Sequence, residues 1–146
     1  GKLRNWWTPE DLKHFQEASA ALAAQYSAYE VLPGLFLNGK QVLAENIAAV
    51  AGLTAAYEAY HASLKGKEAP VINGLTGDQR FFLAYAQSWR EKQRQEALRA
   101  EVATDGHAPG RWRAFTVRNL DAWYPAFNVQ PGEKLYLAPE KRVKIW

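Results

Sequence analysis

Apolar residues recur at helical spacing over several long stretches of the chain. The first stretch follows Thr8, which can cap a helix, and Pro9, which suits the first helical position. The apolar side chains that repeat there are Leu12, Phe15, Leu22, Tyr26 and Tyr29. This spacing predicts a helix from Thr8 to about residue 30, and we expect Pro33-Gly34 to stop it.

A second helix is predicted from Leu43 to about Ser63, and it has two unlike stripes. One stripe is mainly apolar and consists of Leu43, Ile47, Val50, Thr54 and Tyr57. The other has almost no side-chain volume apart from one carboxylate, and it consists of Glu45, Ala48, Ala49, Gly52 and Ala56. Such a face lets a neighbouring helix come close and presents Glu45 to it. Taken alone, an acidic residue in the first turn only favours the helix dipole.

A third helix is predicted to open at Thr76, because Thr76 and Gln79 have the spacing of a capping box. Its buried side carries Phe81, Phe82, Tyr85 and Trp89. From Arg90 to Glu101 the sequence is highly charged, so this half is expected to be a solvated extension. Thr104-Asp105-Gly106 is expected to end the helix.

Shorter elements are predicted in two other places. Leu35 to Val42 is expected to form a small hairpin, because Asn38-Gly39 between apolar flanks suits a type I′ turn. His107 to Gly110 is expected to be a non-helical loop, because it contains Pro109 and Gly110. A short amphipathic element, Arg111 to Leu120, follows this loop.

The end of the chain is predicted to be irregular. Asn119 is a candidate cap for a further turn that contains Trp123, Tyr124 and Phe127. Residues 128–146 contain Pro131, Gly132 and Pro139, and their apolar end, Val143 to Trp146, is expected to dock against the body. The predicted fold class is therefore mainly α, with one short β-hairpin, in a single helical domain over residues 1–146.

Composition sets the broad class of protein. A chain of 146 residues with 48% hydrophobic content can build one core. It has no apolar run of membrane-spanning length and no signal-peptide pattern. The absence of cysteine excludes disulfides and thiolate zinc sites but leaves the compartment open. Because the chain begins at Gly1 and contains no Met, we expect it to be a piece of a longer polypeptide.

The charge of the chain argues against nucleic acid as a partner. The formal net charge is only +3. Arg111-Trp112-Arg113 and Lys141 to Lys144 are basic enough to be considered as contacts. The sequence lacks a basic helix and a base-stacking motif, so we do not expect nucleic-acid binding.

Three short motifs occur in one order along the chain. They are Glu45-Asn46-Ile47-Ala48, then Gln87-Ser88-Trp89, then His107-Ala108-Pro109-Gly110-Arg111-Trp112-Arg113. Asn5-Trp6-Trp7-Thr8 precedes them and Ile145-Trp146 closes the chain. Together they resemble the C-terminal part of the catalytic domain of the neprilysin family. That family contains gluzincin-type zinc metalloendopeptidases, including endothelin-converting enzymes and bacterial oligopeptidases. The resemblance covers essentially the whole chain.

The resemblance implies a role for several residues. Glu45 matches the third zinc ligand, which completes a site with two histidines of an HExxH helix and leaves a position for water. His107 matches the histidine that donates a hydrogen bond to the developing oxyanion. Arg113 matches an arginine that positions the substrate carbonyl, although a purely structural salt bridge is an alternative role for it. Lys144 lies near where the family carries a basic residue for the carboxyl end of a substrate.

Two departures from the family pattern change this expectation. The family has an Asp four residues after the ligand Glu, where it hydrogen-bonds a zinc histidine, and this chain has Ala49. Loss of such a partner typically costs roughly 10- to 100-fold in metal affinity or activity. The only histidines are His14, His61 and His107, and no HExxH motif is present. We therefore expect the chain alone to hydrolyse no peptides and to need two zinc-binding histidines from another segment.

These observations leave three interpretations open. The first is a portion of a zinc metalloendopeptidase that acts on peptides, with its N-terminal remainder in the same or an accompanying chain. The second is an impaired or inactive relative that binds peptides or a partner, and Ala49 favours it. The third is a purely structural helical module, which would be favoured if Glu45 and His107 lay far apart.

The compartment is predicted only from cysteine usage. Vertebrate members of the family are rich in cysteine, whereas Arg90, Val129 and Val143 stand where some cysteines would be expected. This suggests a bacterial-type protein, periplasmic or secreted, although a cytoplasmic location is also compatible with the sequence.

Overall fold

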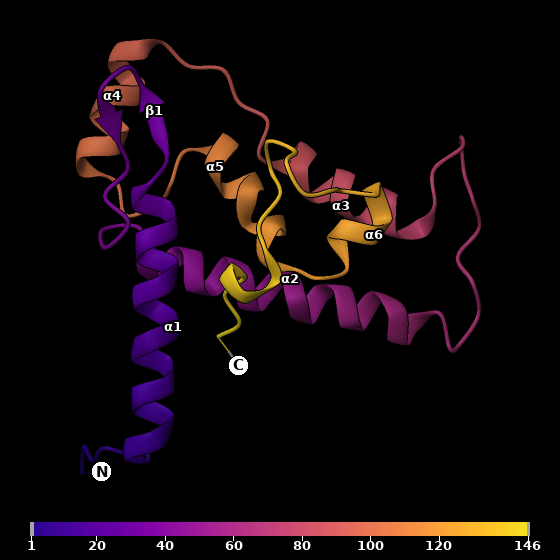
Figure 1. The fold of residues 1–146 in the computed structure, drawn as a ribbon, viewed down its shortest axis with the longest axis horizontal. Coiled ribbons are helices and arrows are strands. Elements are labelled where there is room, and N and C mark those ends of the chain that lie inside the picture. The colour runs from indigo at the N-terminus through magenta and orange to yellow at the C-terminus, as the bar shows by residue number, and fades with distance from the viewer. Residues whose placement is uncertain (1, 146) are drawn as a thin grey trace.

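The structure is a computed structural model that describes residues 2–145, and it is mainly helical (Figure 1). Its elements, in chain order, are α1 (Pro9–Ser27), β1 (Glu30–Leu32), β2 (Leu35–Phe36), α2 (Leu43–Ser63), α3 (Gly77–Ser88), α4 (Gln95–Thr104), α5 (Gly110–Ala114), η1 (Phe115–Asn119), α6 (Trp123–Phe127) and η2 (Pro139–Lys141), where η denotes a 3₁₀ helix. This confirms the predicted class of helices with one two-stranded hairpin. Within residues 2–145, no helix combines the length and the apolar character that crossing a membrane requires.

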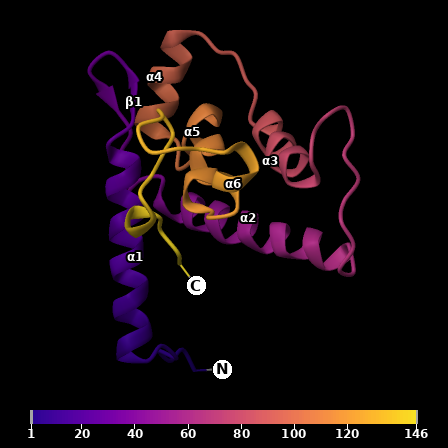
Figure 2. The ribbon, with the colours of Figure 1, turned by 45° about the vertical axis from the view of Figure 1, so that its right-hand side comes forward.

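Helix α1 begins where the sequence predicts. The Thr8 hydroxyl accepts a hydrogen bond of 3.1 Å from the Asp11 backbone N–H, which caps the helix. The helix ends at Ser27, three residues earlier than expected. Figures 1 and 2 show its first half extending away from the other helices and its second half beside the start of α2. Its buried residues, which lie in that second half, are Ser19, Leu22, Ala23 and Tyr26.

Two clusters of buried apolar side chains hold the helices together. The first joins α1 to the start of α2, and it is built from Leu22, Tyr26, Leu37, Val42, Val50, Val102, Ala108, Trp112, Val143 and Ile145. The second joins the middle of α2 to α3 and α6, and it is built from Leu53, Phe82, Val117, Leu120, Trp123 and Tyr124. Helix α2 therefore contributes to both clusters, and its boundaries agree with the prediction.

The hairpin exists, but it lies earlier in the chain than predicted. Strands β1 and β2 pair antiparallel and turn at Pro33-Gly34, where Gly34 has φ of +74°. Asn38 instead turns the chain toward α2, because its side-chain oxygen accepts from the backbone N–H groups of Lys40 and Gln41 at 3.2 and 3.3 Å. Gly39 is needed for a different reason: a Cβ there would overlap the carbonyl oxygen of Ala23.

The predicted third helix is two helices in the structure. The capping box is present, with Gln79 N–H donating to the Thr76 hydroxyl at 3.2 Å and Thr76 N–H donating to Gln79 at 3.0 Å. Helix α3 then ends at Ser88, and the charged stretch begins as an extended connection before α4. The connection is fixed by contacts of Trp89 and Glu91 with α5, so tertiary packing replaces a continuous helix.

Two further predictions about the last third of the chain are wrong in detail. Gly110 is not in a loop but is the first residue of α5. Asn119 does not cap α6; its Oδ1 accepts from Gln25 Nε2 at 3.0 Å and from the Val143 backbone N–H at 2.9 Å. Asn119 thereby ties α1 to the C-terminal segment. Val143 and Ile145 are buried, as the predicted docking requires, and Trp146 lies outside the described residues.

Candidate functional site

Three side chains from two distant parts of the sequence meet at one place in the structure. Glu45 comes from the first turn of α2, His107 from the connection between α4 and α5, and Arg113 from α5. Nε2 of His107 lies 3.2 Å from Oε2 of Glu45. Nη1 of Arg113 lies 3.9 Å from the same oxygen. A wide separation of Glu45 and His107 would have favoured a purely structural module. The two residues are in contact, so this observation does not support that interpretation.

The position of Glu45 follows from the way α2 is packed. Asn46, Val50 and Leu53 face the interior of the protein. Glu45 and Ala49, one turn apart on the same face, lie at the edge of that buried face. The rest of the stripe of small residues is open, because Ala48, Gly52 and Ala56 are exposed. The Glu45 side chain is 43% exposed, so a group from outside residues 2–145 can reach it.

A further carboxylate, from Asp105, holds His107. Asp105 Oδ1 accepts the His107 backbone N–H at 2.8 Å and lies 2.8 Å from His107 Nδ1. These hydrogen bonds, from the His107 side chain first and its backbone second, lower the pKa of Asp105. Both ring nitrogens of His107 thus face carboxylate oxygens, which can only accept.

Arg113 is held mainly by an aromatic ring. Its guanidinium carbon lies 4.3 Å from the centre of the Trp89 ring, and its side chain is 12% exposed. Its Nε is buried and has no hydrogen-bond partner among residues 2–145. The short helix beneath it is fixed at both ends, because Glu91 Oε1 accepts the Gly110 N–H at 2.6 Å and the Tyr85 hydroxyl donates to the Arg113 carbonyl at 3.1 Å.

Sequence reasoning missed Asp105 and Trp89 as parts of this site. The sequence did carry a signal for the contact of Asp105 with His107. An Asp side chain can accept the backbone N–H of the residue two positions later in an Asx-type turn. Trp89 belongs to the Gln87-Ser88-Trp89 motif of the resemblance, but its contact with Arg113 had no signal, because only the interruption between α3 and α4 brings its ring to α5.

Lys144 is not brought to this site by any contact within residues 2–145. Its Nζ lies 2.7 Å from Asp121 Oδ2, and its side chain is 66% exposed. Asp121 also pairs with Arg142 Nη1 at 2.9 Å, and hydrogen bonds from Lys144 and Arg142 lower the pKa of Asp121. In the described chain Lys144 therefore helps to fasten the C-terminal segment.

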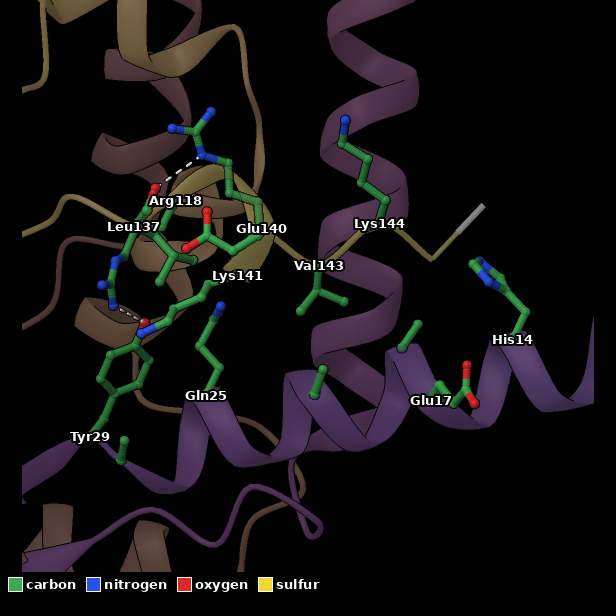
Figure 3. Close-up of a pocket in the computed structure, with 14 residues that line it drawn as sticks. His14, Glu17, Gln25, Tyr29, Arg118, Leu137, Glu140, Lys141, Val143 and Lys144 are labelled. Carbon is green, nitrogen blue, oxygen red and sulfur yellow. Dashed lines mark hydrogen bonds between the residues drawn. The ribbon is translucent and has the colours of Figure 1, made fainter. Parts of the chain in front are cut away.

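A large cavity also lies away from Glu45. It measures about 800 Å³ and opens between α1 and the C-terminal segment. Figure 3 shows His14 and Glu17 of α1 on one side of it and Val143 and Lys144 on the other. None of Glu45, His107 and Arg113 lines this cavity.

The described residues contain no group of three or more His, Asp or Glu side chains arranged to hold a metal ion. Glu45 fits a metal site as one member of a larger ligand set. His107 and Arg113 both approach its Oε2, which leaves Oε1 toward a ligand from elsewhere. Carboxylate oxygen is an ordinary zinc ligand beside imidazole nitrogen.

Comparison with known proteins gives consistent matches over the whole chain. Residues 1–143 match peptidase family M13. The chain is 38% identical to the neutral endopeptidase of Lactobacillus helveticus over all of this chain and 21% of that protein. It is 34% identical to endothelin-converting enzyme 1 of Bos taurus over all of this chain and 20% of that protein. The chain thus spans about a fifth of the length of these relatives.

Solved structures agree with the sequence matches. The zinc metalloprotease Zmp1 of Mycobacterium tuberculosis, solved with an inhibitor, superposes with a TM-score of 0.95 at 42% identity, over 99% of this chain and 23% of that one. A PepO structure from Lactobacillus rhamnosis superposes with a TM-score of 0.82 at 38% identity, over 99% of this chain and 22% of that one. At these identities the likeness extends beyond the fold to the sequence that builds it.

Proposed function

Because the chain belongs to peptidase family M13, we propose that it forms one part of a zinc metalloendopeptidase site that hydrolyses peptides. The observation that carries the proposal is the meeting of Glu45 and His107, with Nε2 of His107 3.2 Å from Oε2 of Glu45. These residues come from separate elements, and the resemblance assigns both to one reaction centre. Arg113 approaches the same carboxylate and completes the group.

Glu45 would be the protein ligand that this chain gives to one zinc ion. The other two ligands would be the histidines of an HExxH segment, in the same or an accompanying polypeptide, and that segment also brings the general-base glutamate. When bound, zinc polarises a water molecule and the scissile carbonyl. The exposed side of Glu45 and the open stripe of small residues beside it leave room for that segment.

The remaining residues of the site would act on the substrate. With Glu45 engaged on zinc, Nε2 of His107 would donate a hydrogen bond to the negative charge that develops on the carbonyl oxygen. Asp105 holds His107 by one hydrogen bond to its backbone N–H and one to its ring Nδ1, so that the ring is already oriented before the peptide binds. Arg113 would bind a second carbonyl oxygen of the peptide through its Nη groups and so fix the register of the substrate.

Zinc content tests this proposal directly. In the complete polypeptide that carries the HExxH segment, Glu45→Gln should weaken zinc binding by roughly 100-fold or more and remove peptidase activity. Glu58→Gln is the matched control, because Glu58 is exposed on the same helix and should leave zinc content unchanged. Equal zinc affinity in wild type and Glu45→Gln would refute the ligand role.

Ala49 supports a second candidate function, an impaired or inactive family member that binds peptides or a partner without cleaving them. The residue lies one helical turn after Glu45 on the same face, where an acidic side chain would stand beside the zinc ligands. Ala49→Asp should raise zinc affinity roughly 10- to 100-fold if the site is only impaired. An unaltered complete polypeptide that takes up no zinc would favour the inactive candidate over the peptidase.

A further inference from the structure

Arg113 carries its charge in a poorly hydrated place with little acidic support. Its side chain is 12% exposed and its Nε is buried without a hydrogen-bond partner in residues 2–145. The carboxylate paired with it, Glu45, lies 3.9 Å from Nη1, close to the outer limit of an ion pair, and is itself 43% exposed. Ala49, one turn further along α2, adds no second acid on that face. Asp105 attracts the guanidinium electrostatically but forms no ion pair with it in residues 2–145. A further contact therefore has to hold the guanidinium in place.

The Trp89 ring supplies the stronger contact. The guanidinium carbon is 4.3 Å from the ring centre, well inside the range of a cation–π interaction. When such a contact is shielded from water it is worth about 30-fold in an equilibrium constant, whereas an ion pair at 3.9 Å with a carboxylate that is 43% exposed is worth about fivefold at most. By these magnitudes Trp89 contributes more than Glu45 to the placement of Arg113.

The segment around Trp89 also fixes the backbone that carries Arg113. A Cβ on Gly110 would overlap the Trp89 carbonyl oxygen, so this oxygen packs directly against the first residue of α5. Glu91, two residues later, accepts the Gly110 N–H at 2.6 Å. The end of α3 thus contacts both the start of α5 and the side chain that α5 presents.

We propose that Trp89 is a positioning residue for Arg113, holding the guanidinium by its ring so that the Nη groups stay available to a peptide carbonyl. The inference rests on the proposed function, because Arg113 is taken to bind substrate. Trp89 acts here through Arg113. The consequence is that its substitution should matter only while the arginine is present.

A double-mutant cycle in the complete zinc-bearing polypeptide tests this dependence. Trp89→Leu should lower kcat/KM about 10- to 30-fold and Trp89→Phe, which keeps an aromatic face, about threefold. In an Arg113→Ala background, Trp89→Leu should change kcat/KM less than about twofold. Trp123→Leu is the matched control: this indole is also buried but belongs to the second apolar cluster, so its loss should lower stability and leave kcat/KM unchanged. Independent, multiplicative losses from Trp89→Leu and Arg113→Ala would overturn the proposal.

A second measurement on the 146-residue chain separates this inference from the peptidase proposal. The ring current of Trp89 should displace the Arg113 Hε resonance upfield, and Trp89→Leu should return it to its ordinary position, with Arg113→Lys used to assign it. An unshifted Hε resonance in the wild-type chain would overturn the positioning role whatever the activity. A complete polypeptide without zinc or activity, but with the shifted resonance, would overturn the peptidase proposal and leave the contact between Trp89 and Arg113 standing.

Discussion

Tyr26 offers a quantitative test of how the helix that carries Arg113 is anchored. The side chain is completely buried, and its hydroxyl lies 3.3 Å from the Trp112 carbonyl oxygen and 3.2 Å from Thr116 Oγ1. Burial raises the pKa of Tyr26 above its ordinary value, so the hydroxyl is neutral at all usual pH values. Tyr26→Phe removes the hydroxyl and leaves two buried polar partners behind.

The expected loss in the free energy of unfolding is about 2 kcal/mol. A neutral hydrogen bond contributes about 1 kcal/mol net, and a buried partner left without one costs about 1 kcal/mol more. For a chain of this size the change corresponds to a fall in Tm of roughly 4–8 °C. Thr116 is completely buried and has no access to water as a replacement partner, which is why the cost should not be smaller.

Tyr60→Phe is the matched control, with the same chemical change and the opposite expectation. The Tyr60 hydroxyl is buried and makes no hydrogen bond to any residue from 2 to 145. Its removal should leave the free energy of unfolding within about 0.5 kcal/mol of wild type or raise it, because an unpaired polar group is replaced by hydrogen.

Urea unfolding followed by circular dichroism measures both variants. Each should keep the wild-type m-value, so that a shift of midpoint reports stability alone. The reasoning is refuted if Tyr60→Phe costs as much as Tyr26→Phe, or if Tyr26→Phe leaves the midpoint unchanged. Either result would mean that the pairing of the buried hydroxyl does not determine the stability of this region.

Three further predictions concern the site and its supports. Asp105→Asn should lower kcat/KM of the complete polypeptide roughly 10- to 100-fold with little change in stability, because His107 loses a charged partner but keeps its own donor group. Steady-state kinetics would measure the loss of activity, and thermal melts would measure the stability. Gly39→Ala should lower the free energy of unfolding by about 2 kcal/mol, because the added methyl group meets the Ala23 carbonyl oxygen; a cost near zero in urea titration would contradict this. The pKa of Asp121 is lowered by Lys144 and Arg142, so its ion pairs should stabilise the chain above about pH 4 and lose that effect as pH falls through the lowered value. The difference in free energy of unfolding between wild type and Asp121→Asn should therefore shrink steadily as pH falls below about 4.

The helices were predictable because their signals are local. Thr8 and the pair of Thr76 with Gln79 cap their helices in the structure as the sequence indicates. The hairpin was misplaced because Asn38-Gly39 satisfies the local rule for a type I′ turn, whereas Gly39 is required for close packing on α1. The break after Ser88 could not be read from periodicity, because it depends on contacts with α5, which is distant in the sequence.

The site was predictable only to the extent that the family resemblance named its residues. Glu45, His107 and Arg113 were selected by matching motifs, and the structure brings these three together. Neither helical spacing nor charge alone would have chosen Glu45 over the other exposed acids. The roles of these residues in zinc binding and catalysis stay predictions.

Helix α2 belongs to both apolar clusters, and this has a mechanical consequence. Glu45 lies near the start of α2 and His61 near its end. At about 1.5 Å per residue the two are roughly 24 Å apart along the helix axis. His61 is tethered to α3 by Asp78 at 2.8 Å. Because the helix is packed in both clusters, a displacement of its far end is carried along its length toward Glu45. Substitution of His61 should therefore change the position of Glu45, which His61 does not contact.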